Sequence, residues 1–142
     1  MMEQRLSIIT LGVSDLKKSR RFYEMLGWKV ASEQQADDIV AFNLQSFVLA
    51  LYPIEEFAKD VGMKGTKIAP PTFTLAYNVD SEGEVDRIID EARNIGAKIV
   101  KEPQKVFWGG YSSYFSDPDG YLWEVAFNPY SQPEKDGAFK WL

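Results

Sequence analysis

The chain has 142 residues, of which 45% are hydrophobic and 26% are charged, and this composition is typical of a folded domain. Its formal net charge of -5 argues against a nucleic-acid-binding surface, which needs clustered lysine and arginine. The sequence contains neither cysteine nor histidine, so disulfides, thiolate nucleophiles and histidine-ligated metal ions are excluded.

The first half of the chain predicts a strand, a helix and three more strands. An apolar segment is followed by Ser14 and Asp15, either of which can cap a helix with its side-chain oxygen. Apolar residues recur at helical spacing as far as about Leu26, and Gly27 is a typical residue for ending a helix. The expected elements are a strand at 6–13, this helix, a return strand at 28–30, and strands at about 39–44 and 47–52.

The second half repeats this order. Asp80 or Ser81 can cap a helix that Gly96 ends, and the segment Asp-Pro-Asp-Gly at 117–120 predicts a tight turn between two strands. The expected elements are a strand at 73–79, this helix, a return strand at 97–100, and strands at about 111–116 and 121–128.

Each half therefore has the order β-α-β-β-β, and one such unit leaves a sheet face uncovered. We expect a single domain over 1–142 built from modules at about 5–53 and 72–129, with a linker at about 54–71 and a tail at 130–142. Because the linker is long, we expect a homodimer whose modules pair within one chain or are swapped between two.

Two segments carry a family resemblance. The segment ITLGVSDLKKSRRFYEMLGWKV at 9–30 resembles the first strand, helix and return strand of the glyoxalase/bleomycin-resistance/dioxygenase (vicinal oxygen chelate) superfamily. The segment YFSDPDGYLWEV at 114–125 resembles its signature hairpin. The resemblance covers nearly the whole chain and implies an α+β fold, in which two paired βαβββ modules form a curved mixed sheet around a concave pocket. It says little about any one activity.

The resemblance also implies where a metal ion would be bound. The family's four ligand positions, two from each module, correspond here to Ile8, Val48, Thr74 and Glu124. Two aliphatic side chains, one hydroxyl and one carboxylate do not make a tight transition-metal site, which needs three or four N, O or S donors. We therefore expect neither a metal ion nor another cofactor, and we do not expect histidine- and metal-dependent glyoxalase or dioxygenase activity.

The predicted pocket centres on Glu124. Strand alternation places Leu122 and Ala126 on the same face, and Ser112 and Tyr114 reach that face across the hairpin. Trp108 precedes these strands, where it lies either on a loop at the pocket rim or over the core. With the family positions, the predicted lining is mostly apolar: Ile8, Val48, Thr74, Trp108, Ser112, Tyr114, Leu122, Glu124 and Ala126.

Two functions fit these residues. The first is a glyoxalase-like protein that binds or sequesters a small hydrophobic or aromatic molecule without a functional metal site. The second is a metal-independent lyase or isomerase in which Glu124 is the general base and Tyr114 the acid or orienting group. Neither involves nucleic acid or membrane as a partner. No apolar run approaches the about 20 residues that span a bilayer, and no secretion signal is recognisable, so we expect a cytoplasmic protein.

Overall fold

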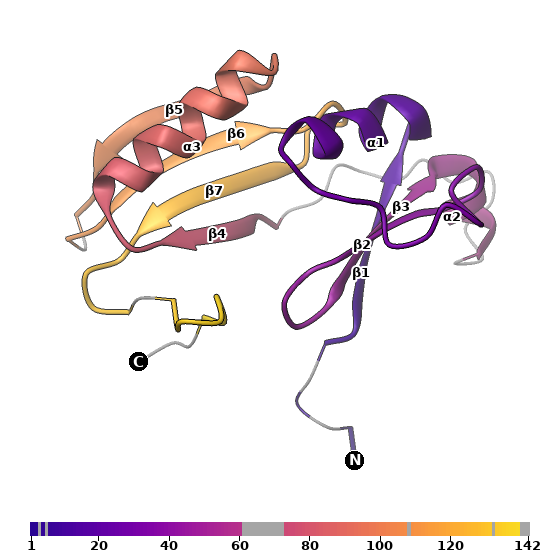
Figure 1. The fold of residues 1–142 in the computed structure, drawn as a ribbon, viewed down its shortest axis with the longest axis horizontal. Coiled ribbons are helices and arrows are strands. Elements are labelled where there is room, and N and C mark those ends of the chain that lie inside the picture. Colours follow the sequence, from indigo (N-terminus) through magenta and orange to yellow (C-terminus); the bar gives the residue numbers. More distant parts are fainter. Residues whose placement is uncertain (3, 5, 61–72, 108, 132, 140–142) are drawn as a thin grey trace. The chain divides into compact units, whose positions relative to one another are not determined.

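The computed structural model describes every residue except 3, 5, 61–72, 108, 132 and 140–142. The chain separates into two units, Met1–Ala69 and Pro70–Leu142, and each has its own mixed sheet (Figure 1). The predicted α+β class is confirmed. The elements are β1 Ile8–Val13, α1 Leu16–Met25, β2 Val40–Asn43, β3 Val48–Pro53, α2 Ile54–Asp60, β4 Leu75–Val79, α3 Glu82–Asn94, β5 Lys98–Lys105, β6 Tyr111–Ser116 and β7 Leu122–Phe127.

The first unit packs α1 on a three-stranded sheet of order β1-β3-β2. β3 runs parallel to β1 and antiparallel to β2. Asp15 begins the helix by accepting a hydrogen bond from the Lys18 N–H at 3.0 Å, which decides between the two predicted caps. The helix buries Tyr23 completely, and the alternate strand residues on that side, such as Leu11 and Leu49, are at most 1% exposed. Ile8 and Val48 alternate with these buried residues and therefore lie on the opposite face of the sheet.

The side chain of Ser19 on α1 gives a stability prediction. The residue is fully buried, and among the described residues its hydroxyl is the one buried side-chain polar atom without a hydrogen-bond partner. An unpaired buried hydroxyl costs free energy, and alanine is also the better helix former. We expect Ser19→Ala to leave the free energy of unfolding unchanged or to raise it by up to about 1 kcal/mol. Urea denaturation followed by circular dichroism would measure this, and a loss of more than about 1 kcal/mol would contradict the unpaired state of the hydroxyl.

The predicted return strand at 28–30 is not a strand in the structure. Directly after it, the Ala31 N–H donates a backbone hydrogen bond to the Ala41 carbonyl of β2 at 2.8 Å. The ring of Trp28 stacks on that of Tyr23, with centroids 5.3 Å apart, and also meets the ring of Phe42 edge-on. The segment is therefore held by packing of the Trp28 side chain rather than by a ladder of backbone bonds, which strand propensity alone does not predict.

Helix α2 lies inside the stretch that the sequence predicted to be a linker. The first turn of α2 lies against the sheet directly after β3 and packs over Gly12 of β1. A Cβ at Gly12 would stand 2.5 Å from Ile54 Cδ1, the movable end of that side chain, and 3.4 Å from the Phe57 ring. The rest of the predicted linker, from residue 61 to 71, falls outside the described residues.

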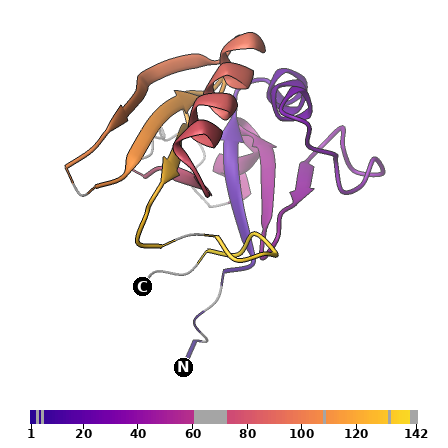
Figure 2. The ribbon, with the colours of Figure 1, turned by 60° about the vertical axis from the view of Figure 1, so that its left-hand side comes forward.

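The second unit has the order β4-β7-β6-β5, with β4 parallel to β7 and the other pairs antiparallel. Figures 1 and 2 both show α3 lying along one side of this sheet. Val85, Ile89 and Ala92 of α3 are at most 1% exposed and supply its buried stripe. The hairpin between β6 and β7 is as predicted, since Gly120 has a φ of 86° and the turn closes on the side chain of Asp117.

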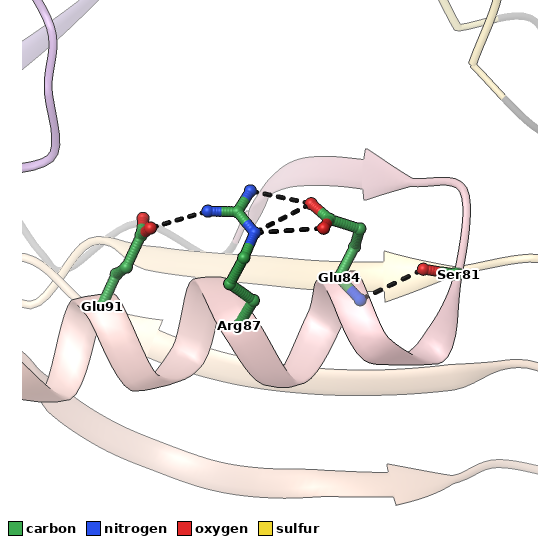
Figure 3. A network of polar contacts seen from close by, with 4 residues as sticks. All are labelled: Ser81, Glu84, Arg87 and Glu91. Carbon is green, nitrogen blue, oxygen red and sulfur yellow. Dashed lines mark hydrogen bonds and ion pairs between the residues drawn. The ribbon is translucent and has the colours of Figure 1, made fainter.

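Helix α3 carries an ion-pair network on its exposed side (Figure 3). Ser81 is the N-cap and accepts a hydrogen bond from the Glu84 N–H at 3.2 Å. Arg87 then bridges Glu84 at 2.7 Å and Glu91 at 2.6 Å, the i, i+3 and i, i+4 spacings that bring side chains together on a helix. Because these ion pairs are exposed, they mark the solvent-facing side of α3, and the charged groups of Glu84, Arg87 and Glu91 are bound to one another. Among the helices of the described residues, none is long and apolar enough to cross a membrane.

Candidate functional site

The side of the second sheet that faces away from α3 carries five of the residues predicted for the site. Two contacts fix which side is which: Tyr111 donates a hydrogen bond to Asp86 of α3 at 2.8 Å, and Glu102 pairs with Arg93 of α3 at 2.7 Å. Residues that alternate with these point the other way. We call this side the free face because α3 does not cover it, although its small residues Ser112, Ser116 and Ala126 are buried. Its rows are Ala76, Glu124, Tyr114 and Lys101; Asn78, Ala126, Ser112 and Gln104; and Leu122, Ser116 and Lys98.

The centre of the free face is a hydrogen-bonded pair. Tyr114 and Glu124 are direct partners across the β6–β7 ladder, and the phenol donates to Glu124 Oε2 at 2.8 Å. No other donor among the described residues bonds to this carboxylate. One carboxylate oxygen is therefore fixed by the protein, and the other has no hydrogen-bond partner among the described residues.

The environment of Tyr114 keeps its phenol protonated. Burial raises its pKa from the ordinary value of 10.0 to about 12, and the hydrogen bond to Glu124 and the charge of that carboxylate act in the same direction. At neutral pH the phenol is thus a hydrogen-bond donor that orients Glu124, and it is not a base. Of the pair, only the carboxylate can accept a proton.

The hydrogen bonds of Tyr111 and Tyr114 predict that these two phenols ionise at an unusually high pH. The pKa of Tyr111 is also raised to about 12, first by its hydrogen bond to Asp86, then by burial and by the charges of Asp86 and Glu82. Because folding raises the pKa of both phenols, their contribution to the free energy of unfolding is complete below about pH 10. It is lost as the pH rises through about 12. Ultraviolet absorbance should show two tyrosines ionising near pH 12, of which Tyr114→Phe and Tyr111→Phe each remove one. Ionisation of either phenol near pH 10 would contradict its hydrogen bond.

The free face is more polar than expected from the sequence. Ser112 lies opposite Ala126 and is 3% exposed, and Asn78 and Gln104 extend that row at its two ends. Asn78 could have been found by counting alternate residues from Thr74. Lys101 and Gln104 could not, because the predicted strand ended at residue 100 whereas β5 continues to Lys105 with two register irregularities.

Two other predicted residues belong to the first unit. Ile8 and Val48 are direct partners in the first sheet, on the face away from α1, and Ile8 is 53% exposed. Thr74 precedes β4 and is exposed, and the residue that lies opposite Glu124 is Ala76. Trp108 lies outside the described residues. The structure thus brings five of the predicted residues together on the free face: Ser112, Tyr114, Leu122, Glu124 and Ala126.

The side chains at the positions that the sequence resemblance assigns to metal ligands do not fit a metal ion. Ile8 and Val48 stand side by side and have no donor atom, and the strand partner of Glu124 is an alanine. Within the described ranges, no group of three or more acidic side chains is arranged to hold a cation. One carboxylate, already bonded to a phenol, provides too few donors for a tight site.

Comparison with known proteins gives consistent matches. Residues 5–125 match the model of the family described as the Glyoxalase/Bleomycin resistance protein/Dioxygenase superfamily. The chain is 32% identical over 126 residues to the fosfomycin resistance protein FosX of Listeria monocytogenes, covering 84% of this chain and 86% of the relative. It is 30% identical over 126 residues to the metallothiol transferase FosB of Lysinibacillus sphaericus, covering 87% and 82%.

A solved structure matches over nearly the full length. It is the crystal structure of a glyoxalase-related enzyme from Fulvimarina pelagi, with a TM-score of 0.88 and 33% identity, and the match covers 98% of this chain and 99% of that one.

Proposed function

The chain belongs to the glyoxalase/bleomycin resistance protein/dioxygenase superfamily, and from that premise we propose that it binds a small organic molecule through the Tyr114–Glu124 pair, without a metal ion. The observation that carries the proposal is the 2.8 Å hydrogen bond from Tyr114 to Glu124 on the free face. A carboxylate that would be a metal ligand in the family is bonded here to a phenol. Its second oxygen can then bond to a ligand directly.

The neighbours of the pair support a ligand with an apolar or aromatic part. Leu122 and Ala126 flank Glu124 on the same face of β7, and Ser112 adds a hydroxyl beside Ala126. Pockets for small molecules combine apolar contact with a few polar groups that fix orientation. We therefore propose binding or sequestration of a small hydrophobic or aromatic molecule that carries at least one hydrogen-bonding group.

The names of the relatives supply the first compound to test. One relative is a fosfomycin resistance protein and another a metallothiol transferase, a name that implies metal chemistry in that protein. The aliphatic side chains of Ile8 and Val48 do not support that chemistry here. Fosfomycin therefore belongs in the test as a ligand to be bound rather than as a substrate to be opened by a metal-activated nucleophile.

A thermal-shift screen with fosfomycin, small aromatic compounds, organic cations and thiol conjugates tests the proposal. A ligand at about 100 times its Kd should add about 2.7 kcal/mol to the free energy of unfolding. Tyr114→Phe should reduce the shift, whereas Tyr111→Phe is the matched control, because Tyr111 lies on the same strand and bonds to α3. Equal shifts in both variants, or no shift with any class, would refute binding at the pair.

The Tyr114–Glu124 bond also favours a second function, a metal-independent lyase or isomerase. Here Glu124 would accept a proton from a carbon of the ligand, and Tyr114 would hold the carboxylate in place. Glu124→Gln separates the two functions, since an enzyme converts its ligand only with the wild type, whereas a binding protein gives no product with either form and shows only weaker affinity in the variant. Incubation of each ligand found in the screen with the wild type and this variant, followed by product analysis, provides that comparison.

A further inference from the structure

We infer that the free face recognises a molecule with a cationic nitrogen at one end and an anionic group at the other, such as an ω-amino carboxylate. The inference rests on the proposed function and names the ligand class. Its basis is the central row of the free face, in which Glu124 and Lys101 carry opposite charges on either side of Tyr114.

The orientation of Lys101 follows from the strand register. Lys101 is the partner of Tyr114 across the β5–β6 ladder, and paired residues in antiparallel strands point to the same side. Its neighbour Glu102 pairs with Arg93 of α3 at 2.7 Å and therefore points to the helix side. The pairing with Tyr114 and the ion pair of Glu102 on the other side together place Lys101 on the free face, where it is exposed.

The charges on the two sides of the sheet differ in how they are neutralised. On the helix side, Arg93 pairs with Glu102, and Lys105 with Glu82 at 3.6 Å. On the free face, neither Glu124 nor Lys101 has an ion-pair partner among the described residues. Two strand spacings, about 10 Å, separate their backbones, and the two side chains form no ion pair with each other. The face therefore has a negative group on β7 and a positive one on β5.

A ligand complementary to this pattern has its positive group at the β7 end and its negative group at the β5 end. Its ammonium would bond to the carboxylate oxygen of Glu124 that Tyr114 does not occupy, and its carboxylate would lie by Lys101. The hydrocarbon between them would cross the ring of Tyr114, and Lys98, one row along β5, adds positive charge at the carboxylate end. An α-amino acid is too short to reach both groups, whereas 6-aminohexanoate has a suitable length.

Isothermal titration of the full chain tests this ligand class. The probes are 6-aminohexanoate, hexylamine, hexanoate and glycine. We expect 6-aminohexanoate to bind roughly ten-fold or more tightly than the other three. Lys101→Gln should reduce its affinity to that of hexylamine. Lys105→Gln is the matched control, since this lysine lies on the same strand but pairs with Glu82 on the helix side.

Charge reversal sharpens the test. Lys101→Glu should transfer the preference from 6-aminohexanoate to 1,6-diaminohexane. Equal effects of the Lys101 and Lys105 substitutions, or equal affinity for the two-ended and one-ended probes, would overturn the inference. If these probes fail while a compound from the thermal-shift screen still binds in a Tyr114-dependent manner, only the inference is lost. If no compound binds, the proposed function fails with it.

Discussion

Glu124→Gln is expected to weaken the binding of a ligand that donates a hydrogen bond to this residue by roughly 10- to 100-fold, the effect of losing a charge-assisted hydrogen bond. Glutamine has the same shape and can still accept the 2.8 Å hydrogen bond from Tyr114, so the pair should stay in place. The loss of affinity therefore reports the charge alone. Isothermal titration with the ligand found in the thermal-shift screen would measure it.

The control for this change is Glu102→Gln, which removes a carboxylate from the helix side of the same sheet. It should leave affinity unchanged. If Glu124→Gln also has no effect on any bound ligand, the carboxylate is a residual acid and the ligand is held elsewhere. If instead binding persists and turnover disappears, the protein is the enzyme of the second proposal.

Tyr23→Ala is expected to lower the free energy of unfolding of the first unit by about 3–5 kcal/mol. Tyr23 is fully buried, and its ring packs on those of Trp28 at 5.3 Å, Phe42 at 5.8 Å and Phe22 at 5.2 Å. Removing the ring leaves a cavity at the point where α1, the 28–31 segment and β2 meet. Urea denaturation followed by circular dichroism would measure the loss.

Met25→Ala on the same helix is the control, because this side chain is 45% exposed and its loss should change stability by no more than about 0.5 kcal/mol. A small effect of Tyr23→Ala would mean that α1 and the 28–31 segment are held by something other than this aromatic cluster. The two variants together therefore test how the first unit is assembled.

The elements with strong local signals were predictable from the sequence. The alternation of apolar and polar residues predicted the bounds of β6 and β7 to within a residue. The helix caps Asp15 and Ser81 were among the residues proposed for each helix start. In both cases the signal lies within a few residues of the element it defines. The same holds for Gly120, whose positive φ the turn requires.

The elements that the sequence misplaced depend on contacts between distant residues. Helix α2 packs over Gly12, some forty residues earlier in the chain. The segment at 28–30 is held by packing of Trp28 against Tyr23 and Phe42. Its sequence pattern had suggested a strand held by backbone hydrogen bonds. The extension of β5 contains two irregularities that no alternation pattern reveals.

The candidate site was predictable only in its centre. Tyr114 was expected on the same face as Glu124 across the hairpin, and the structure shows that the two residues are direct strand partners joined by a hydrogen bond. Lys101 was missed because its position depends on where β5 pairs with β6, across the bulges. The aliphatic character of Ile8 and Val48, by contrast, was visible in the sequence, and the structure adds that the two lie side by side.

Metal analysis of the untagged protein is the most direct test of the claim that Glu124 serves a ligand rather than a metal ion. The protein would be produced with manganese, nickel, zinc and iron in the medium, dialysed without chelator, and examined by inductively coupled plasma mass spectrometry alongside Glu124→Gln. The donor set predicts far less than one metal ion per chain in both samples. A stoichiometric metal ion in the wild type that is lost in Glu124→Gln would contradict the claim.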